Sequence, residues 1–204
     1  SILENSIEND SKLPSSIKNI LNNPRLKGIH NIIYKLIEMD EKYINAIETS
    51  LGASGNFLVV DNEKSASICI EYLKENKLGR ATFFPLNIIK AKTIDYETKS
   101  KINDADGFIG TAKELVKYDS TYENIIANQL GNIIVVDNLD NANKIGKTIG
   151  YKYRIVTLDG DIIHSGGSLT GGSKKTSNSI LKDKEELSDT LKRIEKLDSD
   201  IENS

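Results

Sequence analysis

The sequence predicts a mixed α/β protein of two similar subdomains, flanked at both ends by helices of an antiparallel coiled coil. Two observations lead there: one sequence unit occurs twice in the middle of the chain, and the ends carry a heptad pattern. The composition permits it, because 38% of the 204 residues are hydrophobic, enough for a sizeable core. The formal net charge of -3 argues against a surface that binds polyanions everywhere and leaves room for a local basic patch.

The two ends have the pattern of coiled-coil helices. From residue 180 onward the chain lacks Gly and Pro, and its apolar residues occupy heptad a and d positions: Ile180, Leu187, Leu191, Ile194 and Ile201. In the first ten residues Leu3 and Ile7 lie four apart among acidic residues, before Pro14 breaks the pattern. We expect residues 1–12 to end an incoming helix and residues 180–204 to start an outgoing one, both as parts of a longer chain.

The repeated unit accounts for the α/β middle. GIHNIIYKLIEMDEKY, from Gly28, returns as GFIGTAKELVKYDSTY, from Gly107, and GNFLVVDNEKSA (55–66) returns as GNIIVVDNLDNA (131–142). Each unit predicts a short apolar stretch, a helix, a β-branched strand, a second helix and a further strand. For that last strand, residues 80–84 align with residues 154–158 through their arginines. Asp61 and Asp137, where strand meets helix, are expected to cap helix amides.

These patterns divide the middle of the chain into three parts. Residues 14–92 form subdomain I and residues 106–175 form subdomain II. Between them, residues 93–105 are polar and rich in Lys, and we expect them to form a linker. Cys69 lies in an apolar stretch and is expected to be a small buried residue.

The glycine-rich stretch DGDIIHSGGSLTGGSKK (159–175) does not match a nucleotide-binding loop. A phosphate loop needs Gly-Lys-Ser/Thr five residues after its first glycine. Counted from Gly166 the lysine position holds Gly172, and counted from Gly167 the Ser and Lys are in reversed order. His30 and His164 stand alone, and no zinc-ligand spacing occurs. A small α/β nucleotide-binding domain or enzyme remains the alternative function.

We expect the same stretch to form a sheet edge. It predicts a turn at Asp159–Gly160, a strand through Ile162–Ile163, and a short strand at residues 168–170 between the two glycine pairs. Glycine in an extended segment permits positive φ or the close approach of another backbone. Two chains meeting edge to edge would use such residues.

No run of apolar residues is long enough for a membrane span, and no signal-peptide pattern opens the sequence. We therefore expect a cytoplasmic protein without a membrane partner.

Two motifs resemble the hinge domain of SMC (structural maintenance of chromosomes) ATPases, and the bacterial type most: RATFFPL (80–86) and VTLDGDIIHSGGSLTGGS (156–173). The resemblance covers about residues 14–175. It implies a non-catalytic hinge without a cofactor, because ATP and magnesium would bind at distant heads of the full-length protein. It also implies a homodimer that pairs through strand edges, with kleisin-type subunits bound elsewhere and a nucleoid-associated location.

The resemblance also implies two sets of site residues. DNA, double- or single-stranded, would contact the basic cluster after the glycines, here Lys174 and Lys175. Lysines bind backbone phosphate without reading sequence, and two of them predict modest affinity. Further basic candidates are Arg25, Lys27, Lys90 and Lys92, and a scaffold that binds another protein along the coiled-coil seam is a third hypothesis. The implied dimer interface comprises Gly166, Gly167, Ser168, Leu169, Thr170, Gly171 and Gly172.

Overall fold

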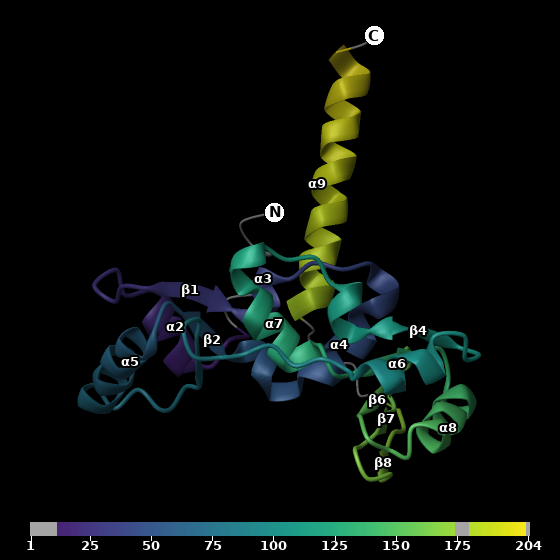
Figure 1. Ribbon diagram of the computed structural model, residues 1–204. Coiled ribbons are helices and arrows are strands. Elements are labelled where there is room, and N and C mark those ends of the chain that lie inside the picture. Colours follow the sequence, from purple (N-terminus) through teal and green to yellow (C-terminus); the bar gives the residue numbers. More distant parts are fainter. Residues whose placement is uncertain (1–11, 174–179, 203–204) are drawn as a thin grey trace.

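The computed structural model describes residues 12–173 and 180–202. These residues form two small sheets with helices around them, and a long C-terminal helix stands out from the domain (Figure 1). The mixed α/β class predicted from the repeat is confirmed.

Sheet I has the strand order β1 (Ile29–Ile32), β2 (Leu58–Val60), β3 (Phe83–Pro85), with β1 antiparallel and β3 parallel to β2. Sheet II begins in the same way with β4 (Phe108–Thr111), β5 (Ile134–Val136) and β6 (Ile155–Thr157). Both sheets have the same irregularity in their first strand: the pairing register shifts between Ile29 and Asn31 in β1 and between Phe108 and Gly110 in β4. Sheet II then adds β7 (Ile162–Ile163) and β8 (Leu169–Thr170), both antiparallel.

The helices also follow the repeat. Between the first two strands of each unit lie short helical turns and one longer helix, and a second helix follows the middle strand. The elements are α2 (Ser15–Leu21), α3 (Ile33–Leu36), η1 (Glu41–Tyr43), α4 (Ile44–Leu51), η2 (Gly52–Asn56), α5 (Glu63–Glu75), α6 (Tyr96–Ile102), η3 (Ala112–Leu115), η4 (Ser120–Tyr122), α7 (Glu123–Leu130), α8 (Leu139–Thr148) and α9 (Ile180–Glu202), where η denotes a 3-10 helix.

The third strand of each unit differs from the alignment drawn through the arginines. Phe83 pairs with Leu58 as Ile155 pairs with Ile134, so Phe83 corresponds to Ile155 and not to Thr157. The alignment of Arg80 with Arg154 was wrong by two residues. The carbonyl of Arg154 accepts a hydrogen bond from the N–H of Ile134, and in the first unit the equivalent carbonyl is that of Thr82. A shift of two leaves each side chain on its predicted face, so the predicted topology still holds.

The helix caps also differ from expectation by one residue. Asn62 accepts a hydrogen bond from the backbone N–H of Ser65, and Asn138 does the same for Asn141. These asparagines, and not Asp61 and Asp137, are the N-caps of the two helices, and both have an extended backbone. Asp137 instead accepts hydrogen bonds from the backbone N–H of Asn138 and from the side chain of Asn141.

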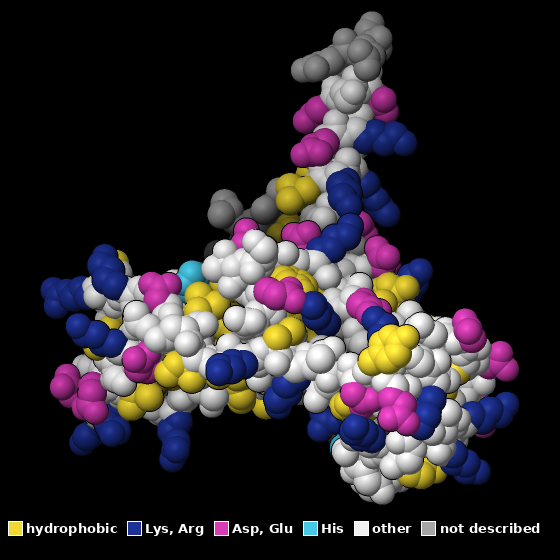
Figure 2. Space-filling model, viewed as in Figure 1, with side chains coloured by type: hydrophobic (Ala, Val, Ile, Leu, Met, Phe, Trp, Pro, Cys, Tyr) yellow, Lys and Arg dark blue, Asp and Glu magenta, His cyan; other side chains and the backbone are white. Residues whose placement is uncertain are grey.

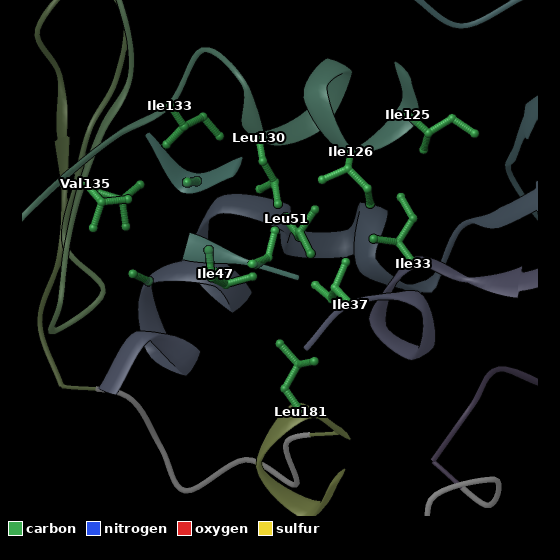
Figure 3. Close-up of a cluster of buried hydrophobic side chains, with 14 of the residues drawn as sticks. Ile33, Ile37, Ile47, Leu51, Ile125, Ile126, Leu130, Ile133, Val135 and Leu181 are labelled. Carbon is green, nitrogen blue, oxygen red and sulfur yellow. The ribbon is translucent and has the colours of Figure 1, made fainter. Parts of the chain in front are cut away.

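One hydrophobic core joins the two halves of the molecule (Figure 3). α4 packs against α7, the helix at the same place in the other unit. Glu38 and Lys117, which are also equivalent, form a backbone bridge with N···O distances of 2.9 and 2.7 Å. The halves are therefore related by approximate twofold symmetry about this bridge. Equivalent pairs in this core include Ile37 and Val116, Ile47 and Ile126, Leu51 and Leu130, and Val59 and Val135.

Each sheet also buries its outer face under its own helices. Leu58 lies with Cys69 and Leu73 of α5 on one side of the molecule, and Ile134 lies with Ala142 and Ile145 of α8 on the other. Cys69 is buried as expected, and burial raises the pKa of its thiol.

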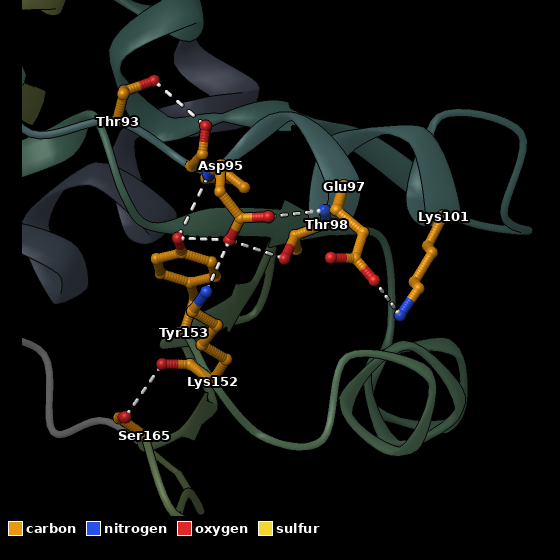
Figure 4. A network of polar contacts seen from close by, with 9 residues as sticks. Thr93, Asp95, Glu97, Thr98, Lys101, Lys152, Tyr153 and Ser165 are labelled. Atoms are coloured by element: carbon orange, nitrogen blue, oxygen red, sulfur yellow. Dashed lines mark hydrogen bonds and ion pairs between the residues drawn. The ribbon is translucent and has the colours of Figure 1, made fainter.

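Residues 93–105, expected to be a linker, contain α6 and belong to the second outer core. Ile94 and Ile102 are buried there, although the segment lacks a sustained apolar pattern. Asp95 holds the start of α6 in place (Figure 4). Its carboxylate accepts hydrogen bonds from the backbone N–H of Thr98 (2.8 Å), from Lys152 Nζ (2.8 Å) and from the Tyr153 hydroxyl (2.7 Å). Lys152, followed by Thr98 and Tyr153, holds the pKa of Asp95 well below its usual 3.8.

Asp95→Asn is expected to lower the melting temperature at pH 7 by a few degrees, because the amide still caps α6 and loses the charge. A carboxyl whose pKa is lowered in the folded state stabilises it fully above the usual pKa, and this stabilisation is lost as the pH falls below 3.8. Thermal melts from pH 7 to pH 2 should therefore show the difference between the two proteins staying constant down to about pH 4 and narrowing below pH 3.8. Glu97→Gln, which removes an exposed charge paired with Lys101 on the same helix, is the control and should change little. A constant difference across the pH range would contradict this role of Asp95.

Candidate dimer interface

The chain after β6 folds into a meander that ends at the edge of sheet II. Gly160, with φ of 87°, donates its N–H to the carbonyl of Thr157, which confirms the predicted turn at Asp159–Gly160. A second turn follows β7, where Gly167 donates to His164 and His164 donates to the carbonyl of Ser168 at 2.7 Å. The predicted strand at residues 168–170 is present as β8.

β8 is an open edge strand. In the order of sheet II it lies at the end, paired with β7 alone among the described residues. His164 and Ser168 form a hydrogen-bonded pair between β7 and β8. In an antiparallel ladder the next pair, Ile163 and Leu169, is not hydrogen-bonded, so the N–H and C=O of Leu169 point away from β7. The Leu169 side chain is 56% exposed. An unpaired edge that carries an exposed leucine is a surface suited to pairing with another strand.

The glycines around β8 are needed by the fold of this one chain. Gly166, Gly167 and Gly172 have φ of 95°, 107° and 130°, a region that other residues rarely adopt. A Cβ at Gly171 would lie 2.5 Å from a carboxylate oxygen of Asp161. The glycines therefore shape the open edge, and a substitution at Gly166, Gly167 or Gly172 would disturb the loop itself.

The structure brings the expected interface residues, 166–172, together on this loop and strand. Lys174 and Lys175, the expected DNA contacts, lie outside the described residues, as does the expected incoming helix apart from Lys12.

α9 is anchored at its base and exposed beyond it. Leu181 reaches the central core and points toward Ile37 (Figure 3), and Lys184 Nζ donates to the carbonyl of Ile37 at 2.7 Å. Farther out, three apolar residues of the heptad seam are exposed, Leu191, Ile194 and Ile201, and Leu197 beside the seam is exposed as well. A helix with such a seam is suited to pairing with another helix.

The histidines hold structural positions. His30 bridges the halves, with Nε2 2.6 Å from Asp61 Oδ1 and Nδ1 2.9 Å from the hydroxyl of Tyr122. His164 Nε2 lies 2.9 Å from Thr170 Oγ1. Within the described residues no group of three or more His, Cys, Asp and Glu is arranged to hold a metal ion. None of the helices in that part of the chain is both long and apolar enough to cross a bilayer.

Charges of both signs are interspersed over the face shown in Figure 2, without a broad basic patch. Sequence reasoning missed Lys152 and Arg154, which lie with Lys92 around a hollow at the C-terminal ends of α4 and α7. No local sequence signal marks them, because they come together only through the fold.

Comparison with known proteins identifies the family. Residues 26–146 match the model of the SMC proteins flexible hinge domain. The chain is 42% identical over 175 residues to chromosome partition protein Smc of Bacillus subtilis (strain 168), covering 85% of this chain and 15% of that protein. It is 43% identical over 165 residues to chromosome partition protein Smc of Clostridium kluyveri, covering 80% of this chain and 14% of that protein. The chain thus spans only about a seventh of the length of these curated relatives.

Solved structures agree with the sequence match. The crystal structure of an asymmetric dimer of the Geobacillus stearothermophilus SMC hinge domain superimposes with a TM-score of 0.89 at 36% identity, covering 99% of this chain and 85% of that one. The Pyrococcus furiosus SMC hinge domain superimposes with a TM-score of 0.65 at 28% identity, covering 87% and 93%. The match is to a hinge, as expected for a fragment that is not catalytic. By the family match, the repeated fold and these structures, the chain belongs to the SMC flexible hinge domains.

Proposed function

We propose that this chain is the dimerisation hinge of a bacterial SMC protein that acts in chromosome condensation and segregation. Two copies would pair through sheet edges, with β8 and residues 166–172 contributing one edge. The observation that carries the proposal is the open β8 edge with its exposed Leu169. Family membership and the dimer formed by the Geobacillus stearothermophilus hinge support it.

The proposed hinge sits between two arms. Residues 1–12 and 180–204 would belong to an antiparallel coiled coil, and the exposed seam of α9 supports this. Residues 14–92 and 106–175 would be the two subdomains, with residues 93–105 running between them. In the full-length protein, ATP and magnesium would bind at the distant heads, and kleisin-type subunits would bind away from the hinge.

The molar mass of the chain in solution tests whether it dimerises, and a substitution at Leu169 tests whether β8 forms the contact. If the chain pairs with a different protein and not with a second copy, it would be a monomer on its own and would associate only when that protein is added.

Lys174 and Lys175 are proposed to contact DNA phosphates weakly and without reading sequence. Reversing both charges (Lys174→Glu with Lys175→Glu) is expected to weaken DNA binding and to reduce the slope of log affinity against log salt by about 2 for each chain. The dimer mass should not change. Fluorescence anisotropy with a labelled oligonucleotide at several salt concentrations measures this. Lys144→Glu with Lys147→Glu, on the exposed face of α8, gives the same change in net charge as a control. Equal binding by both variants would refute the assignment.

A further inference from the structure

A hollow of about 520 Å³ lies where the two halves of the chain meet, at the C-terminal ends of α4 and α7. Its walls come from separate segments. Ser50 and Ser54 come from the first half, and Asn128, Gln129 and Asn132 come from the end of α7 and the loop after it. The remaining wall is formed by the approach to β6 and by the turn after β7. A hollow of this size is in the range of small-molecule sites.

Lys92 is held at this hollow by a tight backbone crossing. The segment before α6 passes over the end of α7, where Asn128 Nδ2 donates to the carbonyl of Lys90 at 2.8 Å. A Cβ at Gly131 would lie 2.1 Å from the carbonyl oxygen of Lys92, so only glycine lets the two backbones come this close. The position of Lys92 is thus fixed by the fold.

The charged side chains around the hollow are all basic. Lys92, Lys152 and Arg154 line it, and no Asp or Glu does among the described residues. Lys152 is paired with Asp95, which lies behind it at 2.8 Å. Lys92 and Arg154 have no acidic partner within the described part of the chain. Like charges gathered around one concavity raise the local positive potential, which a bound anion would lower.

Uncharged donors complete the lining. The side-chain amide of Asn132 makes no hydrogen bond to another described residue. His164 and Ser165 border the same space, but Ser165 adds no free donor to it, because its hydroxyl donates to the carbonyl of Lys152 at 3.0 Å (Figure 4). Amide and guanidinium N–H groups beside an ammonium group form the donor set that phosphate oxygens accept from.

We propose that this hollow binds a phosphate-bearing ligand, held chiefly by Lys92 and Arg154. The phosphate would come either from a nucleic-acid backbone or from a free phosphate compound, since both present the same oxygens. The site is separate from Lys174 and Lys175 and uses residues of one chain, so it depends on neither the proposed DNA contact nor the dimer.

The test compares Lys92→Glu with Arg154→Glu, made together, against the wild-type chain. The control is Lys144→Glu with Lys147→Glu, which has the same net charge and leaves the hollow intact. Two probes are titrated at low salt: inorganic pyrophosphate by calorimetry, and a labelled single-stranded oligonucleotide by anisotropy. Circular dichroism and light scattering establish that each variant keeps the wild-type fold and association state. If the double glutamate fails to fold, Lys92→Gln with Arg154→Gln replaces it.

Binding of at least one probe is expected to weaken about tenfold or more in the hollow variant and to stay near wild type in the control. Loss of both probes identifies a site open to free phosphate compounds, and loss of the oligonucleotide alone identifies a backbone phosphate site. The proposal is overturned if neither probe binds the wild-type chain, if the hollow variant binds both as wild type does, or if the control loses as much. The variant with both Lys174 and Lys175 reversed, run alongside, separates failure of the proposed DNA contact from failure of this site.

Discussion

Leu169→Asp is expected to turn the dimer into a folded monomer. The leucine is already 56% exposed in the single chain, so the substitution should leave the fold of each chain nearly unchanged. In a pair of identical chains the change occurs twice, and each aspartate would place an unpaired charge at the contact between edges. We expect the dimer to weaken about a hundredfold or more, measured by sedimentation velocity across a dilution series.

Leu139→Asp is the matched control for this experiment. Leu139 is also partly exposed, at the start of α8, where an acidic residue is favourable to the helix. The Leu139→Asp variant should dimerise as the wild-type chain does. If Leu169→Asp dimerises as tightly as the control, the interface lies away from β8. Leu169 is a better probe than the glycines, because at Gly166, Gly167 and Gly172 a side chain would strain the loop whether or not a partner is present.

Ile126→Ala is expected to lower the free energy of unfolding by about 2–5 kcal/mol, the usual cost of emptying a fully buried site. Ile126 of α7 and its equivalent Ile47 of α4 lie in the core shared by both halves (Figure 3). Ile47→Ala should therefore cost a similar amount. Urea unfolding followed by circular dichroism measures both. Leu191→Ala on the exposed part of α9 is the control and should change stability by about 0.5 kcal/mol or less.

The shape of the unfolding curve carries a second test of this core. Because residues of both halves pack into one cluster, unfolding should be a single cooperative transition in the wild-type chain and in both isoleucine variants. Two separate transitions, with only one shifted by Ile126→Ala, would show instead that the halves are independent domains.

The repeat made most of the fold predictable from sequence. The identical Gly-Asn and Val-Val-Asp-Asn segments predicted the middle strand of each repeated unit, β2 and β5, and the pattern around Gly160 predicted the hairpin after β6. The errors occurred where one residue type was given too much weight. An arginine in each unit suggested an alignment of the third strands that was wrong by two residues. The aspartates at the ends of the middle strands suggested helix caps, although the asparagines that follow them are the caps.

The rest depended on contacts that no local pattern encodes. α6 looked like a linker because its segment contributes only Ile94 and Ile102 to the core and is otherwise polar. The basic hollow joins Lys92 with Arg154 and His164, which are far apart in the chain. The sequence identified Lys92 only as one of several scattered basic residues. The open edge at β8 was predicted from its glycines, although these glycines have reasons within the single chain.

Sedimentation equilibrium of the unmodified chain at micromolar concentration measures the molar mass and tests directly whether this domain pairs two chains. We expect a mass of twice 22.6 kDa that falls toward the monomer value only on strong dilution. A mass of 22.6 kDa throughout the concentration range would contradict the proposal that this domain pairs two chains.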